Sequence, residues 1–331
     1  MKHIALIGCA HIHTPNFVKK LASRTDVRVD MVWDHDAERA KKNAEQLPHS
    51  RVIAAMDEAF DDKSIDAVVI CSETDRHSDL VVGAAEAKKY MFVEKPLGIG
   101  AKDAYRMASA IEKAGVMFQT GYFMRGSSIH QFLRKAIADG KFGKITRIRH
   151  TNCHQGSLKG WFDTEWRWMA DIRQAGCGAF GDLGTHSLDI LLWLMGEAAS
   201  VTANVHVATS RYGNTDEYGE GLVEFKSGAV GSLAGGWVDI AHPVSVIVSG
   251  TEGHAYVANG QLFVQGERFG SDGKNPLTEL PPALPHAFDL FLDAVTGAKC
   301  ELVGAREAAY RSAVMEAMYD SARTKKWVSP K

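Results

Sequence analysis

Two histidines follow the first apolar run of the chain and offer nitrogen atoms to a ligand. The run His3 to Gly8 (HIALIG) leads directly into Cys9-Ala10-His11-Ile12-His13. Dinucleotide-binding folds carry G-x-G-x-x-G at this point, because glycines let the backbone approach the pyrophosphate at a helix N-terminus. Only Gly8 matches, since Ala10 and His13 replace the other two glycines. The segment alone is a weak indication of a dinucleotide site, although the His13 imidazole could donate a hydrogen bond to phosphate.

Pro15 lies early in the helix that should follow this turn. Either Thr14 caps a helix whose first residue is Pro15, or the first helical turn is strained. The sequence leaves both possibilities open.

An acidic residue ends the second predicted strand. Asp34 lies 21 residues after His13, close to where a carboxylate accepts hydrogen bonds from the adenosine ribose of NAD. A carboxylate at this place would repel the 2′-phosphate of NADP, whereas Arg39 could accommodate it. We expect NAD, with NADP disfavoured; the alternative is that Asp34 is a solvated turn residue.

The H-x-H pair also has a metal-binding interpretation. Barrel-type hydrolases hold zinc with imidazoles at strand ends, but such a site needs three or four ligands. The alternation of strands and helices here stops near residue 120, short of eight units. We therefore predict no metal.

A charged pair adjoins a proline at the end of the fifth predicted strand. Glu94-Lys95-Pro96 follows the apolar run YMFV. Ligands of open parallel sheets bind at the carboxyl ends of the strands. This position indicates a functional site.

The elements that must position these residues alternate in the first third of the chain. Short apolar runs predict strands at 3–8, 27–33, 67–71, 90–94 and 116–120. Between them, apolar residues recur at spacings of three and four, which is typical of covering helices. This alternation predicts a doubly wound α/β domain over residues 1–120.

The alternation of predicted strands and helices ends near residue 120. A helix at 129–140 leads to an irregular tryptophan-rich stretch that ends near 173, and another helix covers about 182–195. Strand-like runs follow at 199–207, 218–226, 229–238, 243–249, 253–258 and 261–265, and helical stretches at 286–295 and 305–324. Closely spaced strands without intervening helices predict a mainly antiparallel sheet in an α+β domain over residues 121–331.

Composition limits the possible partners and surroundings. The 331 residues carry 38 Lys plus Arg and 40 Asp plus Glu, which gives no basic footprint for nucleic acid or an anionic membrane. No apolar run approaches the length of a membrane span, and the chain starts directly in a strand without a signal peptide. We expect a cytoplasmic protein whose five scattered cysteines are reduced thiols.

Several of these motifs together resemble one family. Asp34, Glu94-Lys95-Pro96, the stretch 68–77 and G-x-G-x-x-x-D-x-x-x-H from Gly176 to His186 are similar to those of the glucose-fructose oxidoreductase/inositol dehydrogenase (Gfo/Idh/MocA) family. The resemblance covers essentially the whole chain. It implies a Rossmann domain, then an α+β domain whose open, predominantly antiparallel sheet supports oligomers. It also implies that a nicotinamide cofactor oxidises or reduces sugars and polyols.

The resemblance assigns roles position by position. It implies that Lys95 is the active-site lysine and that Asp182 and His186 are its polar partners. Ser72, Glu73, Thr74 and His77 occupy the family's T-P-N-x-x-H segment beside the nicotinamide, where Glu73 and Thr74 depart from Pro and Asn. Trp166-Arg167 falls where many members carry a Trp-Arg pair near the cofactor, and Tyr122 and Arg125 lie in a segment that often faces substrate.

The expected chemistry is oxidation of a secondary alcohol, which needs hydride and proton acceptors. His186 is the best proton acceptor, and Asp182, four residues earlier on the same helical face, can orient it. Lys95 either stabilises the developing alkoxide or carries the proton itself. Trp161, Trp166 and Trp168 suit sugar C–H surfaces or the core, and Lys159 and Arg173 could recognise an anionic substrate.

These expectations give two residue sets. We expect the cofactor to contact Gly8, Ala10, His11, Ile12, His13, Asp34, His35, Arg39, Ser72, Glu73, Thr74, His77, Glu94, Lys95, Trp166 and Arg167. We expect the substrate to contact Lys95, Tyr122, Arg125, Trp161, Asp182 and His186.

The predicted function is an NAD-dependent dehydrogenase of a sugar, an inositol-like polyol, or a sugar acid or lactone, which works as a homodimer or homotetramer. Three alternatives remain. Bound NAD could be recycled in a redox-neutral epimerisation, elimination or glycoside cleavage. The chain could also be a metal-dependent hydrolase, or a nucleotide sensor without catalysis.

Overall fold

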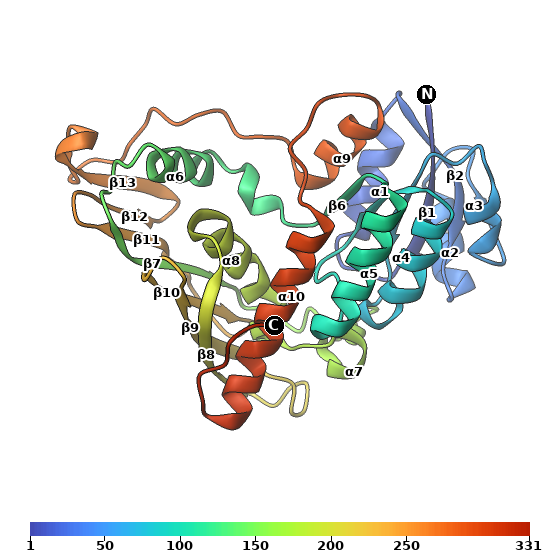
Figure 1. Cartoon of the computed structure of the whole chain (residues 1–331). Coiled ribbons are helices and arrows are strands. Elements are labelled where there is room, and N and C mark those ends of the chain that lie inside the picture. The colour runs from blue at the N-terminus through green and yellow to red at the C-terminus, as the bar shows by residue number, and fades with distance from the viewer.

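The N-terminal part of the molecule is a six-stranded parallel sheet covered on both faces (Figure 1). The computed structural model describes all residues, 1–331. The strand order is β3-β2-β1-β4-β5-β6, which is the doubly wound dinucleotide-binding order. The strands are β1 (Lys2–Cys9), β2 (Val27–Trp33), β3 (Arg51–Val52), β4 (Ala67–Cys71), β5 (Tyr90–Val93) and β6 (Phe118–Thr120). The helices are α1 (Thr14–Ser23), α2 (Ala37–Ala44), α3 (Asp57–Asp61), α4 (His77–Glu86) and α5 (Gly100–Ala114).

The predicted doubly wound domain is confirmed. Its central strands are buried from both sides, and β4 is buried at every position, as expected for a parallel sheet between helical layers. Strand β3 was not predicted, because its two residues, Arg51 and Val52, are exposed and form no apolar run. Helix α1 begins at Thr14 after His13, and Pro15 lies within its first turn, so Thr14 is not its cap.

The C-terminal part is an eight-stranded sheet of order β14-β13-β12-β11-β7-β10-β9-β8. Its strands are β7 (Ile145–Cys153), β8 (Ala198–His206), β9 (Tyr218–Phe225), β10 (Val230–Gly236), β11 (Val244–Gly250), β12 (His254–Ala258), β13 (Gln261–Gly266) and β14 (Ser271–Asp272). Only β7 and β10 run parallel, which confirms a mainly antiparallel sheet. The central strand β7 was not among the six predicted strands, since exposed Arg147 and Arg149 interrupt its apolar pattern.

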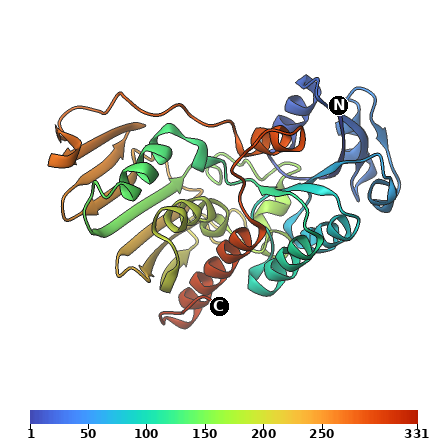
Figure 2. The same ribbon diagram turned by 45° about the horizontal axis from the view of Figure 1, so that its top comes forward.

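Helices cover one face of this second sheet (Figure 2). Helix α8 (Ala179–Met195) packs on β7, β9 and β10, and it is joined there by α6 (Ser128–Ala138) and α10 (Ala305–Thr324). A Cβ at Gly235 would lie 2.6 Å from the backbone nitrogen of Gly184. The absence of side chains at this contact therefore lets α8 lie directly against β10. The other face of the sheet carries exposed Leu222 and Val230.

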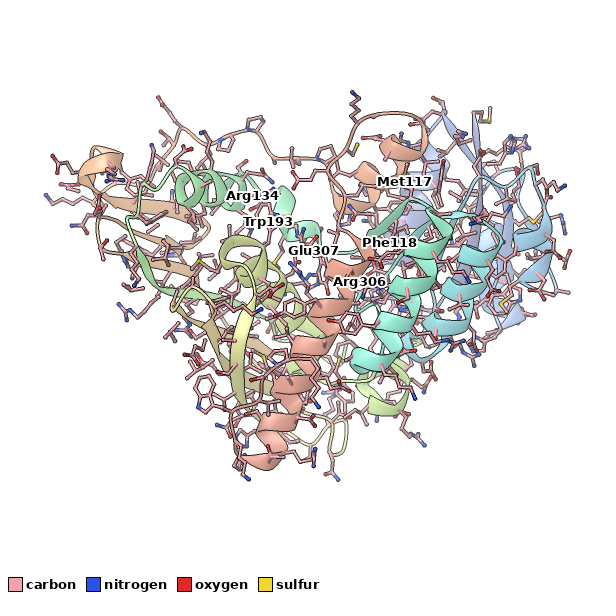
Figure 3. The ribbon with its side chains drawn as sticks, in the orientation of Figure 1. Met117, Phe118, Arg134, Trp193, Arg306 and Glu307 are labelled. Atoms are coloured by element: carbon pink, nitrogen blue, oxygen red, sulfur yellow. The ribbon has the colours of Figure 1, made fainter.

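The end of the chain returns to the first sheet. Helix α9 (Ala287–Val295) packs on β5 and β6, and its Phe288 and Phe291 join Phe17 and Phe92 in one core cluster. Helix α10 then runs along α5, and Figure 3 shows Arg306 and Glu307 at its start beside Phe118 of β6. The boundary at 120/121 remains a prediction, but α9 belongs to the core of the first sheet.

Short elements complete the structure. Helix α7 (Ile172–Ala175) and four 3-10 turns, η1 (Thr74–Arg76), η2 (Phe123–Gly126), η3 (Arg167–Ala170) and η4 (Glu267–Phe269), connect the larger elements. None of the helices combines the length and the apolar character needed to span a lipid bilayer.

Candidate functional site

Lys95, Asp182 and His186 come together between the two sheets. Lys95 follows β5, and its Nζ donates to Asp182 Oδ1 over 2.6 Å and to the Asp182 carbonyl over 3.3 Å. Asp182 and His186 lie one turn apart in α8. All three line a cavity of about 250 Å³, here called the Lys95 pocket. It also receives Ile12 and His13 from the first domain, and Asn152, His154 and Trp161 from the second.

The Lys95–Asp182 pair is ionised. Burial opposes the charged form of Lys95, but the carboxylates of Asp182 and Glu94 outweigh it and raise its pKa. Burial likewise opposes ionisation of Asp182, but Lys95 and the indole of Trp237 hold its pKa below the usual range. Trp237 Nε1 donates to Asp182 Oδ2 over 3.1 Å. Lys95 is therefore a fixed cationic hydrogen-bond donor and not a free base.

His186 is neutral beside this pair. Burial, and then the positive charge of Lys95, lowers its pKa to about 3. Its Nδ1 is buried without a hydrogen-bond partner. The ring packs against Phe123, with the centroids 5.1 Å apart. A neutral imidazole in the pocket can accept a proton.

A second imidazole enters the Lys95 pocket from the turn after β1. His13 Nδ1 lies 3.0 Å from Glu94 Oε1, and Glu94 Oε2 accepts from the Lys95 backbone N–H over 3.0 Å. Burial opposes ionisation of Glu94, but the imidazoles of His11 and His13, and Lys95, hold its pKa well below the usual range. Glu94 is thus an acceptor, so His13 donates through Nδ1 and keeps Nε2 free.

The same three residues have the composition of a metal site. Ligand atoms of His11, His13 and Glu94 all lie within 4.8 Å of one another, and two imidazoles with one glutamate can hold zinc. However, His11 Nδ1 already accepts the His13 backbone N–H over 3.2 Å. The first sheet is open and has six strands, so it is not the barrel that the hydrolase interpretation needs. The absence of a bound metal remains a prediction.

The turn after β1 is held tightly against its neighbours. Gly8 has φ of +79°, and a Cβ there would lie 2.6 Å from the Cβ of Ser72. The Ala10 carbonyl accepts a hydrogen bond from Trp168 Nε1 over 3.0 Å. Gly8 is therefore required by the contact between the ends of β1 and β4 as well as by backbone conformation.

Arg39 covers Asp34, the residue expected to bind the adenosine ribose. Its guanidinium donates to both oxygens of Asp34, over 2.9 and 2.8 Å, and to Glu73 Oε1 over 2.9 Å. Asp34 also accepts the Cys9 backbone N–H, and its side chain is not exposed. His35 Nδ1 lies 3.3 Å from Asp34 Oδ1. The expected ribose contact therefore requires Arg39 to move away from Asp34.

Several residues expected near the cofactor do not reach the Lys95 pocket. His77 is buried, and its Nδ1 donates to the Leu97 carbonyl, so it ties α4 to the loop after Lys95. Ser72 and Thr74 are buried at the end of β4. Arg167 lies over the ring of Tyr212, 4.7 Å from its centroid, and Trp166 packs against the cluster that contains Trp168. Trp168 contacts the turn after β1 through its hydrogen bond to the Ala10 carbonyl.

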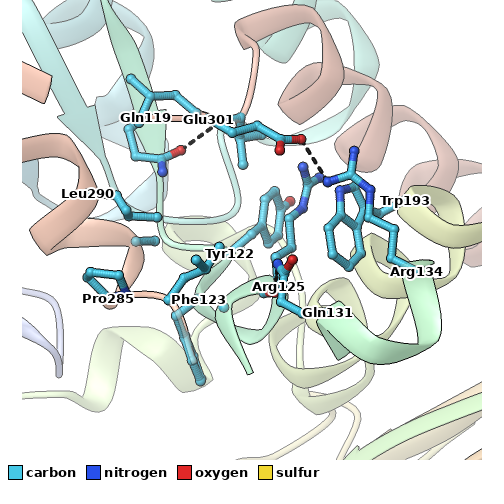
Figure 4. A pocket seen from close by; sticks show the side chains of 15 residues that line it. Gln119, Tyr122, Phe123, Arg125, Gln131, Arg134, Trp193, Pro285, Leu290 and Glu301 are labelled. Carbon is cyan, nitrogen blue, oxygen red and sulfur yellow. Dashed lines mark hydrogen bonds and ion pairs between the residues drawn. The ribbon is translucent and has the colours of Figure 1, made fainter. Parts of the chain in front are cut away.

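Two residues expected to bind substrate have other partners. Arg125 is ion-paired with Asp189 and Glu307 and lines a separate cavity of about 40 Å³ at the domain junction (Figure 4). The Tyr122 hydroxyl bonds with Thr185 Oγ1 over 3.1 Å, and its side chain is buried. Neither Arg125 nor Tyr122 lines the Lys95 pocket, and their contact with substrate remains a prediction.

The remaining substrate expectations differ in outcome. Trp161 does line the Lys95 pocket and is 41% exposed. Lys159 and Arg173 lie outside it, and Arg173 pairs with Asp171 on the surface.

Part of the pocket wall was not predicted from the sequence. Asn152 and His154 lie at the carboxyl end of β7, and Phe123 and Met124 follow β6. Their signal is positional, because each lies at or just after the carboxyl end of a strand, the place where ligands of open sheets bind. Recognition of β7 as a strand would have placed Asn152 and His154.

Comparisons with known proteins agree with this architecture. The family description "Oxidoreductase family, NAD-binding Rossmann fold" matches residues 2–122, and "GFO/IDH/MocA C-terminal domain" matches residues 130–256. Myo-inositol 2-dehydrogenase of Thermotoga maritima is 29% identical over 235 residues, 70% of this chain and 67% of that protein. The scyllo-inositol 2-dehydrogenase (NAD(+)) of Bacillus subtilis is 28% identical over 262 residues, 76% of this chain and 72% of that protein.

A solved structure shows the same fold. Levoglucosan dehydrogenase in complex with NADH and levoglucosan superposes with a TM-score of 0.82 at 20% identity, over 99% of both chains. Both domain matches and both inositol dehydrogenases point the same way, so the chain belongs to the GFO/IDH/MocA family of NAD-binding oxidoreductases.

Proposed function

We propose that this chain transfers a hydride between NAD and a secondary alcohol or ketone of a sugar, an inositol-like polyol, or a sugar acid or lactone. The observation that carries the proposal is the buried Lys95–Asp182 ion pair beside neutral His186 in the Lys95 pocket. The inositol dehydrogenases among the relatives support a polyhydroxylated ring as substrate.

The fixed charge of Lys95 suits the reacting oxygen. NAD, when bound, supplies the carbon that accepts the hydride. Lys95 Nζ donates a hydrogen bond to the substrate oxygen, and Asp182 and Trp237 hold the donor in place. Donors that are oriented before the reaction stabilise the charge that develops on oxygen.

His186 accepts the hydroxyl proton. Its low pKa makes it a weak base in the free protein. However, the positive charge of Lys95 favours the alkoxide over the alcohol, so it lowers the pKa of the substrate hydroxyl and lets a weak base take the proton as the hydride leaves. His13, held by Glu94, is the alternative acceptor.

The second imidazole also favours a second candidate function. A redox-neutral epimerisation or elimination needs one group for the O–H proton and another for a C–H proton next to the transient ketone. His186 and His13 both line the Lys95 pocket. Such a reaction would use bound NAD without net formation of NADH.

The test is NADH formation, followed by absorbance, with a panel of aldoses, inositols, aldonates and lactones. Reduction of NAD by one class supports the dehydrogenase. A product formed from a panel sugar with no net NADH supports the redox-neutral function instead. If NAD binds but no sugar or polyol changes, both proposals are wrong. The predicted cytoplasmic location and the exclusion of nucleic acid and membrane partners remain predictions.

A further inference from the structure

A second cavity adjoins the Lys95 pocket. It has a volume of about 470 Å³ and shares Phe123, Met124 and Asn152 with that pocket as lining. Its other walls come from the start of α6, from β7 and β11, and from the segment that precedes α9. We call it the outer cavity. Its volume lies within the range of small-molecule sites, about 300–1,000 Å³.

The outer cavity has no charged residue in its lining. No Lys, Arg, Asp or Glu lines it, and its titratable residues are His130, His150, His242 and His286. Burial lowers the pKa of each of these four imidazoles, so they are neutral at pH 7. Phosphate and carboxylate groups need charged or multiple donors, and this lining has no cation to offer them.

The cavity nevertheless offers hydrogen-bond groups. Asn152 donates to the Leu183 carbonyl through Nδ2, which leaves its Oδ1 free to accept. His286 Nδ1 accepts the Phe288 backbone N–H, so neutral His286 carries its proton on Nε2 and can donate there. Hydroxyl groups can use both, because each hydroxyl is both a donor and an acceptor.

An aromatic ring lies where the two cavities meet. Phe123 stacks on His286, with centroids 5.3 Å apart and an interplanar angle of 12°, and its ring also contacts His186 in the Lys95 pocket. Figure 4 shows the Phe123 ring pointing away from the Arg134–Glu301 pair, which lines the separate cavity at the domain junction. Its apolar surface suits the C–H face of a sugar ring.

We propose that the outer cavity binds a second, uncharged sugar ring, so that the substrate oxidised in the Lys95 pocket is a neutral glycoside such as a disaccharide. The proposal rests on the dehydrogenase function proposed above. It names a substrate longer than a free inositol or monosaccharide, and it excludes sugar phosphates as the preferred class.

The experiment compares kcat/KM with NAD for matched substrates of one and two rings. Glucose is paired with maltose and cellobiose, galactose with lactose, and glucose 6-phosphate and myo-inositol are included. We expect at least one disaccharide to exceed its own monosaccharide by tenfold or more. Thermal unfolding of each variant below checks that it is folded.

Two matched variants assign that preference to the outer cavity. Ala283→Trp fills the cavity from an exposed loop, and Ala298→Trp makes the same change in an exposed loop away from it. Ala283→Trp should reduce the two-ring to one-ring ratio at least tenfold, whereas Ala298→Trp should leave the ratio unchanged.

Each other outcome overturns the proposal. If kcat/KM for the monosaccharides or inositols equals or exceeds that for every disaccharide, the outer cavity has no role and the dehydrogenase function stands. A preference for glucose 6-phosphate contradicts the neutral lining. An unchanged ratio in Ala283→Trp places the second ring elsewhere. If no sugar of either length reduces NAD, the dehydrogenase function fails and this proposal fails with it.

Discussion

At the scale of single residues, the site depends on which groups are charged. Lys95 and Asp182 form a buried ion pair, and His186 beside them is neutral. Removal of one partner of such a pair leaves an uncompensated charge, so the two residues act as a unit. Trp237, 55 positions after Asp182, holds the second carboxylate oxygen.

The neutral state of His186 predicts how stability depends on pH. Its pKa falls from about 6.5 in the unfolded chain to about 3 in the fold. The unfolded state therefore binds the proton more readily, and stability that is complete above pH 6.5 is lost as the pH falls towards 3. Between pH 6.5 and 5 this residue should contribute a loss of about 2 kcal/mol. Urea unfolding of wild type and His186→Gln at pH 7 and 5 measures this loss of unfolding free energy. An equal loss in both proteins would refute the assignment of a neutral His186 in the folded state.

Arg39 predicts the coenzyme preference. Two carboxylates, Asp34 and Glu73, occupy its guanidinium, so it is not available to a 2′-phosphate. In Asp34→Ala/Glu73→Ala, the freed guanidinium can pair with the phosphate of NADP. The ratio of kcat/KM for NADP to that for NAD should rise about tenfold or more, equivalent to about 1.4 kcal/mol. Glu38→Ala, an exposed carboxylate on the same helix, serves as the control. A ratio that does not move in the double variant would show that Arg39 does not select the coenzyme.

At the scale of elements, helix α8 carries Asp182 and His186 to the Lys95 pocket. The sequence predicted this helix at 182–195, and its Asp-x-x-x-His spacing placed Asp182 and His186 on one face. It could not predict how closely α8 lies on β10, because that depends on Gly184 and Gly235 meeting without side chains. Nor could it predict that Arg125 pairs with Asp189 of helix α8, since the two residues are 64 positions apart in the sequence.

A single methyl group should disturb this contact. In Gly235→Ala the new Cβ would meet the Gly184 nitrogen at 2.6 Å, so α8 must shift from β10. Overpacking of this kind costs about 1–3 kcal/mol, and the shift moves Asp182 relative to Lys95. The midpoint temperature of thermal unfolding and kcat should both decrease, whereas the affinity for NAD should not change. Ala234→Ser on the same strand is the control, and an unchanged kcat in Gly235→Ala would show that the contact does not position the site.

At the scale of the whole molecule, two sheets meet at a pocket to which both contribute. The alternation of strands and helices was sufficient to predict the first sheet, because periodicity is local. The sequence did not predict that α9, more than 160 residues later, completes the core of that sheet through Phe288 and Phe291. Such packing depends on contacts between distant segments, which local patterns do not encode.

The open face of the second sheet predicts self-association. Leu222 and Val230 are 41% and 45% exposed on the face that no helix covers. We expect a dimer or tetramer by light scattering at micromolar concentration. Leu222→Glu should shift the population towards monomer, whereas Val52→Glu, an equally exposed position on the first sheet, should not. A monomeric wild type would contradict this prediction.

The most direct test of hydride transfer in the Lys95 pocket follows the hydrogen itself. A sugar or polyol found active in the panel is prepared with deuterium on the carbon that is oxidised. The mass of the NADH formed is then measured by mass spectrometry. We expect one deuterium in the cofactor. We also expect Lys95→Met to bind NAD but to react about 10²-fold or more slowly than wild type. A cofactor without deuterium, or a Lys95→Met enzyme as fast as wild type, would contradict hydride transfer in the Lys95 pocket.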